Sequence, residues 1–264
     1  MRVLVVVPTY QEAENVGELL IRLRAAVPEA DVLVVDDDSP DGTAEITEAA
    51  GRALGRVRVL VRERKGGLGS AYRAGFGRGL EEGYDVIVQM DADLSHDPAA
   101  VPSLLAAVTA GADIAVGSRY VAGGSIPNWP AYRRNLSRFG NRYATRMLGL
   151  GINDATSGFR AYRADALRGI DVVNTTTTGY GFQIELANRV ARAGYLMTEV
   201  PIVFRDRVRG TSKMSLGIVG EALWSVTRWG IGQRLGRGTA SGFSAHLSPH
   251  APNEGEGHRE QEGG

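Results

Sequence analysis

The sequence contains no cysteine at any of its 264 positions. A disulfide framework, a thiolate metal site and a cysteine nucleophile are therefore excluded, and any metal ion must bind to oxygen or nitrogen ligands. Histidine is also scarce, because three of the four histidines lie beyond residue 240. The sequence suggests no histidine general base.

Long apolar runs are missing as well. No stretch approaches the roughly 20 residues that a membrane-spanning helix needs. The opening segment MRVLVVVPTY is too short an apolar run for a signal peptide and continues as a strand pattern, so we expect a cytosolic chain that does not cross a membrane by itself.

The chain has no excess of charge of either sign, with 30 basic and 30 acidic residues. This balance gives no reason to expect a nucleic-acid partner. Only two of the basic residues are lysines, Lys65 and Lys213. Each is either a functional residue retained against a bias toward arginine or an ordinary surface residue.

Short valine-rich runs alternate with helix patterns along the first half of the chain. Continuous apolar runs such as 31–36 are typical of strands buried on both faces of a parallel sheet. We expect strands at 2–7, 31–36, 57–62, 84–90 and 112–117, and helices at 12–27, 41–54, 69–82 and 98–110. This alternation predicts an α/β fold with a doubly wound sheet and helices on both faces. Ligands of such sheets bind beyond the carboxyl ends of the strands.

The second half predicts strands at 158–163 and 195–204 around a helix at 180–193, and two amphipathic helices at 131–149 and 214–235. The first of these two carries five arginines, and the second carries Trp224 and Trp229. Their apolar stripes either meet a membrane interface or pack on the sheet. The expected division is a catalytic domain at 1–213, an amphipathic helix at 214–237 and a disordered tail at 238–264.

Acidic residues follow two of the expected strands. Asp91 and Asp93 stand where the fourth strand ends, and carboxylates on such an edge can hold Mg²⁺ or Mn²⁺ against a diphosphate. Since a lone Asp-x-Asp is a weak signal, a solvated turn is the alternative. The acidic cluster at 36–38 can accept hydrogen bonds from a ribose or base, while Ser39 or Asp41 can cap the next helix.

A glycine-rich stretch at 65–70 opens the helix that follows the third strand. Backbone amides in that position are suited to binding an anion. The stretch is not a Walker sequence, and the segment after the first strand lacks the G-x-G-x-x-G of dinucleotide-binding proteins. Both absences argue against a dehydrogenase.

Several motifs together resemble the family-2 glycosyltransferases of the GT-A fold, and within them the polyprenol or dolichol phosphate mannose synthases. The matching segments are VVVPTYQE (5–12), VVDDDSPDGT (34–43), KGGLGSA (65–71), MDADLSHDP (90–98), GSRYVAGG (117–124), NWPAYRR (128–134), DATSGFRAYR (154–163) and RVRGTSK (207–213). The resemblance covers residues 2–215. It implies a GT-A, Rossmann-like, mostly parallel sheet with interfacial amphipathic helices.

The resemblance also implies roles for individual residues. The nucleotide would be held by Pro8, Tyr10, Glu12, Val35, Asp37 and Ala92, the metal and donor diphosphate by Asp91 and Asp93, the sugar or acceptor side by Arg119, and the acceptor phosphate by Arg133, Ser137, Arg209 and Lys213. Ser95 stands where some relatives have a glutamine metal ligand, and it would be a weaker ligand there. Asp154 would either orient the attacking group or support the turn at Ser157 and Gly158.

The implied reaction is an inverting transfer of mannose from GDP-mannose to a polyprenyl phosphate, with Mg²⁺ or Mn²⁺ as cofactor. The lipid phosphate is already an anion, so it needs alignment and charge screening rather than a strong base. We therefore expect a peripheral enzyme on the cytoplasmic membrane surface, with an integral-membrane protein as a further possible partner. The alternatives are a UDP-glucose-dependent glucosyltransferase and a non-catalytic nucleotide-sugar-binding module.

Overall fold

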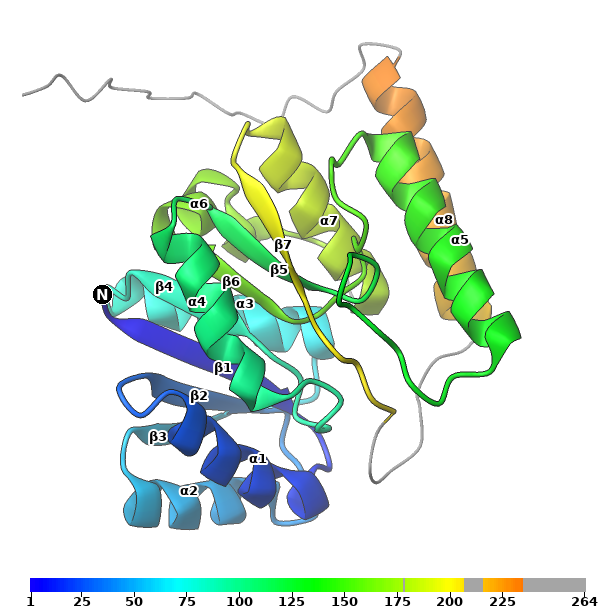
Figure 1. Ribbon diagram of the computed structural model, residues 1–264. Coiled ribbons are helices and arrows are strands. Elements are labelled where there is room, and N and C mark those ends of the chain that lie inside the picture. The colour runs from blue at the N-terminus through cyan, green and yellow to red at the C-terminus, as the bar shows by residue number, and fades with distance from the viewer. Residues whose placement is uncertain (178, 207–215, 235–264) are drawn as a thin grey trace, which may run out of the picture.

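The computed structural model describes residues 1–177, 179–206 and 216–234. Its centre is a sheet of seven strands in the order β3-β2-β1-β4-β6-β5-β7 (Figure 1). The strands are β1 (Val3–Thr9), β2 (Asp31–Asp36), β3 (Val57–Val61), β4 (Val86–Gln89), β5 (Ile114–Ser118), β6 (Arg160–Arg163) and β7 (Met197–Pro201). Each of these strands lies where the sequence predicts one.

Strand β6 is the one strand of this sheet that runs against its neighbours. It pairs antiparallel with β4 and β5, whereas the other neighbouring pairs are parallel. The expectation of a mostly parallel, doubly wound sheet is therefore confirmed. Because β6 is reversed, the loop that precedes it, residues 154–159, reaches the sheet edge where the parallel strands end.

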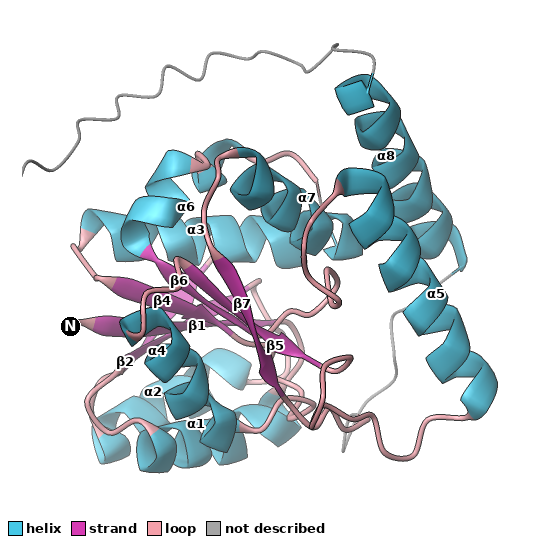
Figure 2. Cartoon of the chain, turned by 45° about the horizontal axis from the view of Figure 1, so that its top comes forward, coloured by secondary structure: helices cyan, strands magenta, loops and turns pink. Residues whose placement is uncertain are grey.

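Helices cover both faces of the sheet, as Figure 2 shows. One face carries α1 (Ala13–Ala26), α2 (Thr43–Leu54) and α4 (Val101–Thr109), and the other carries α3 (Leu68–Glu81), α6 (Ala164–Gly169) and α7 (Gly179–Arg192). Two short 3₁₀ turns, η1 (Pro98–Ala100) and η2 (Val172–Asn174), complete these layers. The side chains of β1 alternate between the two cores, with Val5 in one and Leu4 in the other.

The remaining helices, α5 (Ala131–Leu148) and α8 (Leu216–Arg234), lie side by side at the flank of this body (Figures 1 and 2). The hydroxyls of Tyr143 and Thr227 form a hydrogen bond of 2.7 Å between them. Val226 of α8 is buried in the core of the α3 face. The two amphipathic helices thus form, and part of each apolar stripe packs inward.

Within the described part of the chain no helix is long and apolar enough to cross a membrane. The boundary expected at residue 213 and the tail at 238–264 lie outside the described residues. The division into a catalytic domain, a terminal helix and a tail therefore stays a prediction.

Candidate functional site

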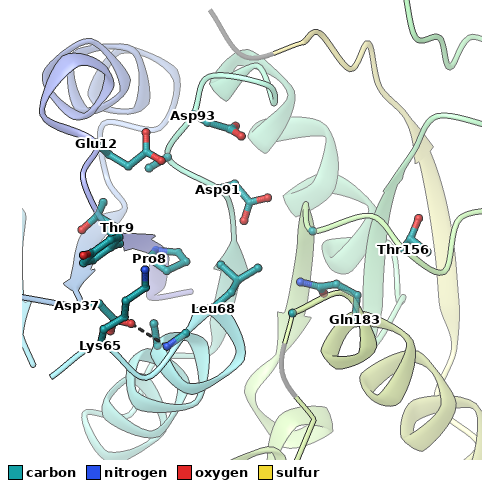
Figure 3. Close-up of a pocket in the computed structure, with 16 residues that line it drawn as sticks. Pro8, Thr9, Glu12, Asp37, Lys65, Leu68, Asp91, Asp93, Thr156 and Gln183 are labelled. Carbon is teal, nitrogen blue, oxygen red and sulfur yellow. Dashed lines mark hydrogen bonds between the residues drawn. The ribbon is translucent and has the colours of Figure 1, made fainter. Parts of the chain in front are cut away.

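A cavity opens at the carboxyl ends of β1, β2 and β4, where the sequence predicts a ligand (Figure 3). Its lining residues are Pro8, Thr9, Tyr10, Glu12, Asp37, Lys65, Gly67, Leu68, Ala71, Asp91, Ala92, Asp93, Thr156, Gly158, Gly179 and Gln183. Most of the residues expected to hold the nucleotide and the metal meet here. Val35 does not line the cavity, because its side chain points from β2 into the core.

The Asp37 carboxylate organises the glycine-rich loop at the cavity wall. It accepts hydrogen bonds from the amides of Gly66 and Gly67 at 3.0 and 2.9 Å, and it forms an ion pair of 2.7 Å with Arg62. Gly67 has φ +81°, a backbone angle that favours glycine. Two amides expected to bind an anion therefore donate to Asp37.

Lys65 and Tyr10 also line the cavity. The Lys65 ammonium lies 3.6 Å from the centre of the Tyr10 ring, which is a cation–π contact. This contact places a positive charge beside an aromatic face in the cavity, and both groups suit a nucleotide, the ring for the base and the ammonium for phosphate.

The segment after β2 also ties two helices together. Asp41 accepts a hydrogen bond from the amide of Ala13, the first residue of α1, and another from the amide of Thr43, the first residue of α2. Ser39 instead donates its hydroxyl proton to Asp36. The N-cap of α2 is Gly42 rather than Ser39 or Asp41, but Asp41 still binds the first amide of each of the two helices.

Asp91 and Asp93 project into the cavity from the loop after β4 (Figure 3). The Tyr72 hydroxyl donates to Oδ1 of Asp91 at 2.7 Å, and the backbone amide of Ser95 donates to Oδ1 of Asp93 at 3.1 Å. Gly158 lies so close that an added Cβ would stand 3.1 Å from Oδ2 of Asp91. Both carboxylates are thus held in place by their neighbours.

The donor set fits a hard divalent ion that shares its coordination with a substrate. No cluster of three or more histidine, cysteine, aspartate or glutamate side chains suited to a metal occurs within the described residues. Mg²⁺ and Mn²⁺ are commonly held by one or two carboxylates together with phosphate oxygens and water. Ser95 is buried and does not line the cavity.

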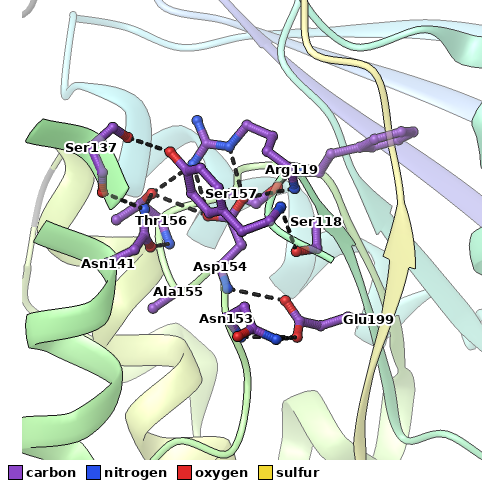
Figure 4. Close-up of polar contacts among 12 residues, drawn as sticks. Ser118, Arg119, Ser137, Asn141, Asn153, Asp154, Ala155, Thr156, Ser157 and Glu199 are labelled. Carbon is purple, nitrogen blue, oxygen red and sulfur yellow. Dashed lines mark hydrogen bonds and ion pairs between the residues drawn. The ribbon is translucent and has the colours of Figure 1, made fainter. Parts of the chain in front are cut away.

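Beyond the cavity, Arg119 and Asp154 form a buried ion pair (Figure 4). Asp154 accepts hydrogen bonds from Nε and Nη2 of Arg119, both at 2.7 Å, and from its backbone amide at 3.1 Å. Burial alone would raise the pKa of Asp154, but the charge and hydrogen bonds of Arg119 outweigh that effect and hold the pKa below its usual value. Asp154 therefore stays ionised and holds the Arg119 guanidinium.

This ion pair connects to the cavity through Thr156. The Thr156 hydroxyl accepts from Nη2 of Arg119 at 2.7 Å and from Nδ2 of Asn141 at 3.0 Å. Asn141 belongs to α5, and a second hydrogen bond reaches the same helix: the hydroxyl of Tyr120, the residue after Arg119, donates to the Ser137 hydroxyl at 2.7 Å (Figure 4). The structure thus brings together three residues predicted for the sugar and acceptor side, Arg119, Asp154 and Ser137.

Arg133 lies near the start of α5 and has protein partners of its own. Its guanidinium donates to Asp206 at 3.1 Å and stacks 3.9 Å over the Trp129 ring. Asp206 also accepts a hydrogen bond of 2.7 Å from the Trp129 indole. Pairing of Arg133 with this carboxylate is the alternative to a phosphate-binding role. Arg209 and Lys213, predicted to join Arg133, lie outside the described residues.

His96 packs between aromatic rings rather than lining the cavity. Its ring lies 5.1 Å from that of Phe159 and 5.4 Å from that of Phe204. Burial lowers the pKa of His96 to about 4, so the imidazole is neutral near pH 7.

Sequence reasoning missed Thr156, Gln183 and Tyr72. Thr156 lies inside a segment that carries the family resemblance and had no role assigned to it. Gln183 and Tyr72 lie on helices that read as ordinary amphipathic segments. No local signal separates these two side chains from helix residues that face the core, so only the fold reveals them.

The sequence matches the model of the family described as glycosyl transferase family 2 over residues 4–170. An undecaprenyl-phosphate mannosyltransferase from Micrococcus luteus is 54% identical over 234 residues, which cover 89% of this chain and 96% of that protein. A polyprenol monophosphomannose synthase from Mycolicibacterium smegmatis is 48% identical over 237 residues, which cover 89% of each chain.

Solved structures show the same fold at lower identity. A glucosyl-3-phosphoglycerate synthase from Mycobacterium tuberculosis, in complex with Mn²⁺, UDP and glucosyl-3-phosphoglycerate, superposes with a TM-score of 0.63 at 20% identity, covering 90% of this chain and 81% of that one. A mannosyltransferase from Pyrobaculum calidifontis in complex with GDP-mannose and Mn²⁺ superposes with a TM-score of 0.58 at 17% identity, covering 90% of this chain and 65% of that one.

Proposed function

Since the chain belongs to glycosyl transferase family 2, we propose that it transfers mannose from GDP-mannose to a polyprenyl phosphate with inversion at the anomeric carbon. The observation that carries this proposal is the cavity itself. It gathers Tyr10 and Lys65, which suit a nucleotide, and the carboxylates of Asp91 and Asp93 at one edge of the sheet. The mannosyltransferase relatives at 54% and 48% identity support the sugar and the lipid acceptor.

The donor would lie along the cavity with its nucleoside near Tyr10 and Lys65 and its diphosphate beside Asp91 and Asp93. The two carboxylates would hold a divalent ion, Mg²⁺ or Mn²⁺. Bound there, the ion would neutralise negative charge on the departing diphosphate. The aspartates are rigidly placed by Tyr72 and by the amide of Ser95, which favours a defined geometry of the diphosphate.

In the reaction, an oxygen of the lipid phosphate forms a bond to C1 of mannose while the bond from C1 to the diphosphate oxygen breaks. GDP leaves with that electron pair, and the configuration at C1 inverts. The attacking oxygen is already anionic, so no proton has to be removed. Asp154, whose two carboxylate oxygens accept from Arg119, would act by positioning that cation rather than as a base.

The acceptor phosphate would bind where the α5 helix meets the Arg119 network. Ser137 is linked to this network through Tyr120, and Arg133 lies one helical turn earlier. We propose that the lipid phosphate takes the place of the Asp206 carboxylate on Arg133. Arg209 and Lys213, which follow Asp206 closely in sequence, would supply further positive charge.

A lipid acceptor requires that one surface of the protein meets a bilayer, and α5 offers that surface. Tyr132, Leu136 and Phe139 share one stripe of α5 and are 74%, 58% and 69% exposed. The helix carries five arginines and no acidic residue. Such a combination favours the interface of an anionic membrane. We therefore propose peripheral binding on the cytoplasmic face, with an integral-membrane protein as a possible partner.

Helix α8 would contribute one of its two tryptophans to this surface. Trp224 is 63% exposed, whereas Trp229 packs against the buried core of the α3 face. The sequence left open whether these tryptophans meet a membrane interface or pack on the sheet. On this structure Trp224 suits that place, and Trp229 anchors α8 to the protein.

The decisive experiment incubates the purified protein with a short-chain polyprenyl phosphate and radiolabelled GDP-mannose or UDP-glucose, with Mn²⁺, Mg²⁺ or EDTA. We expect metal-dependent labelling of the lipid from GDP-mannose. Labelling from UDP-glucose instead would favour the glucosyltransferase alternative. Donor binding without any transfer would favour a non-catalytic module.

A further inference from the structure

Gln183 lies in the first half of α7 and lines the cavity on the side opposite Lys65. Figure 3 shows it across the cavity from Asp37 and Lys65, with Asp91 between them. The family resemblance of the sequence assigned no role to this residue. Its place in the wall makes it a candidate contact for whatever occupies that end of the cavity.

The Gln183 amide is buried without a partner. Only 3% of the residue is exposed, and neither its Nε2 nor its Oε1 atom has a hydrogen-bond partner among the described residues. Two other buried polar side chains of α7 are paired, since Glu185 accepts from Arg189 and Asn188 accepts from Gln233. Burying an amide donor and acceptor without partners is unfavourable, so this pair of atoms indicates a missing hydrogen-bonding group.

The covalent structure of a nucleotide sugar indicates which part of the donor would be the hydrogen-bonding partner of the Gln183 amide. Nucleoside, diphosphate and sugar follow one another along the molecule. With the nucleoside at Tyr10 and Lys65 and the diphosphate at Asp91 and Asp93, the sugar falls at the opposite end. That end is formed by Thr156, Gly158 and Gln183.

We propose that the Gln183 amide binds hydroxyl groups of the transferred hexose. A carboxamide offers both a donor and an acceptor, and adjacent sugar hydroxyls offer the same pair in return. Thr156 and Gly158 are less suited to this role, because the Thr156 hydroxyl already pairs with Arg119 and Asn141, and Gly158 has no side chain. This inference rests on the proposed function, and it makes Gln183 a residue that recognises the sugar part of the donor.

The test compares a nucleotide with and without its sugar on the intact protein. Binding of GDP and of GDP-mannose is measured by calorimetry in Mn²⁺ without lipid acceptor, for the wild type and for Gln183→Met. Methionine keeps the length of the side chain and removes the amide. We expect GDP to bind equally to both proteins, and GDP-mannose to bind the variant about 10- to 100-fold more weakly. That range corresponds to about 1.4 to 2.8 kcal/mol.

Asn188→Leu provides a matched control on the same helix. Asn188 is a buried amide of α7 that does not line the cavity and pairs with Gln233. Its replacement should leave both affinities unchanged. A second variant, Gln183→Glu, keeps an acceptor and should retain more sugar recognition than Gln183→Met if the amide contacts hydroxyls.

The outcomes separate this inference from the proposed function. If the wild type binds GDP-mannose more tightly than GDP and Gln183→Met does so by the same factor, the amide does not recognise the sugar and the inference is wrong. Replacement of an amide that merely lacks partners would in that case raise the melting temperature without changing binding. If the wild type binds neither GDP-mannose nor GDP, the proposed donor itself is wrong.

Discussion

The Tyr72 hydroxyl donates a hydrogen bond of 2.7 Å to Oδ1 of Asp91. Tyr72 is fully buried and stacks against Phe76 and Phe182 at centroid distances of 5.6 and 6.0 Å. Burial, followed by the charge of Asp91, raises the pKa of Tyr72 well above its ordinary value, so the phenol stays protonated and remains a donor. A core side chain thereby fixes the orientation of a proposed metal ligand.

Tyr72→Phe should therefore weaken metal binding while the fold survives. Loss of the hydroxyl removes one hydrogen bond that orients the Asp91 carboxylate, and a hydrogen bond to a charged group is worth about 1.5 to 3 kcal/mol. We expect a roughly tenfold higher Mn²⁺ concentration at half-maximal binding, measured by calorimetry in the presence of GDP. Tyr162→Phe is the matched control, because its buried hydroxyl donates to Gln89 and not to a cavity residue. Equal Mn²⁺ affinity in both variants would show that the hydrogen bond only fills the core.

Asp91→Asn and Asp93→Asn should abolish transfer and leave the melting temperature nearly unchanged. Each substitution removes a hard anionic ligand from a strand end rather than an apolar core group. EDTA should inactivate the wild type, and added Mn²⁺ should restore it. Asp97→Asn changes an exposed carboxylate of the same loop and should remain active. Turnover by either Asp91→Asn or Asp93→Asn at the wild-type rate would exclude a metal held by these carboxylates.

Asp154→Ala should destabilise the protein by about 3 to 5 kcal/mol, because it removes the carboxylate that neutralises the buried Arg119 cation. Urea unfolding measures this loss. The double variant Arg119→Met with Asp154→Leu should recover most of the stability and none of the activity. Recovery of activity as well would mean that the pair is only structural.

The same ion pair gives a pH dependence of stability. The pKa of Asp154 is lower in the folded protein than its ordinary value of 3.8. Its contribution to stability is therefore complete above about pH 4 and is lost as pH falls through the folded value. Below pH 4 the melting temperature of the wild type should fall more steeply than that of the double variant. Parallel curves would contradict this linkage.

Arg133→Ala and Ser137→Ala should each reduce the acceptor kcat/KM, by one to two decades for the arginine, with GDP-mannose binding unchanged. A charge-assisted contact to phosphate is worth roughly 1.5 to 3 kcal/mol, and about 1.4 kcal/mol corresponds to a factor of ten. Arg209→Ala and Lys213→Ala should behave as Arg133→Ala does. Arg146→Ala, an exposed arginine at the far end of α5, is the control. If Arg133→Ala instead lowers stability with normal acceptor kinetics, its pairing with Asp206 is purely structural.

Leu136→Asp and Phe139→Asp should weaken co-sedimentation with vesicles of anionic lipid several-fold. Each replaces an exposed apolar side chain of α5 by a charge that resists insertion at an interface. Kinetics with a short-chain acceptor in detergent should stay normal. Ile21→Asp changes an equally exposed residue of α1 and should bind vesicles as the wild type does. Unchanged sedimentation of the α5 variants would place the membrane contact elsewhere.

The sequence by itself determined the alternation of strands and helices and the position of Asp91 and Asp93, the proposed metal ligands, at the end of a strand. Valine-rich runs such as 31–36 and apolar spacing at 3.6 residues are local patterns, and they predict strands and helices without knowledge of the partner elements. Asp91 and Asp93 could be placed because the carboxyl ends of parallel strands share one edge of a sheet. Motif resemblance then indicated the substrates.

Only the tertiary structure decided which distant side chains meet. The reversal of β6 carries Asp154 and Thr156 to the site, and no feature of the strand sequence records its direction. Packing between elements far apart in the chain leaves the Gln183 amide without a hydrogen-bond partner among the described residues. It also brings the Tyr72 hydroxyl to Asp91. Asp37, which lines the cavity, also holds the glycine loop, because a buried carboxylate takes the nearest amides and guanidinium that the fold supplies.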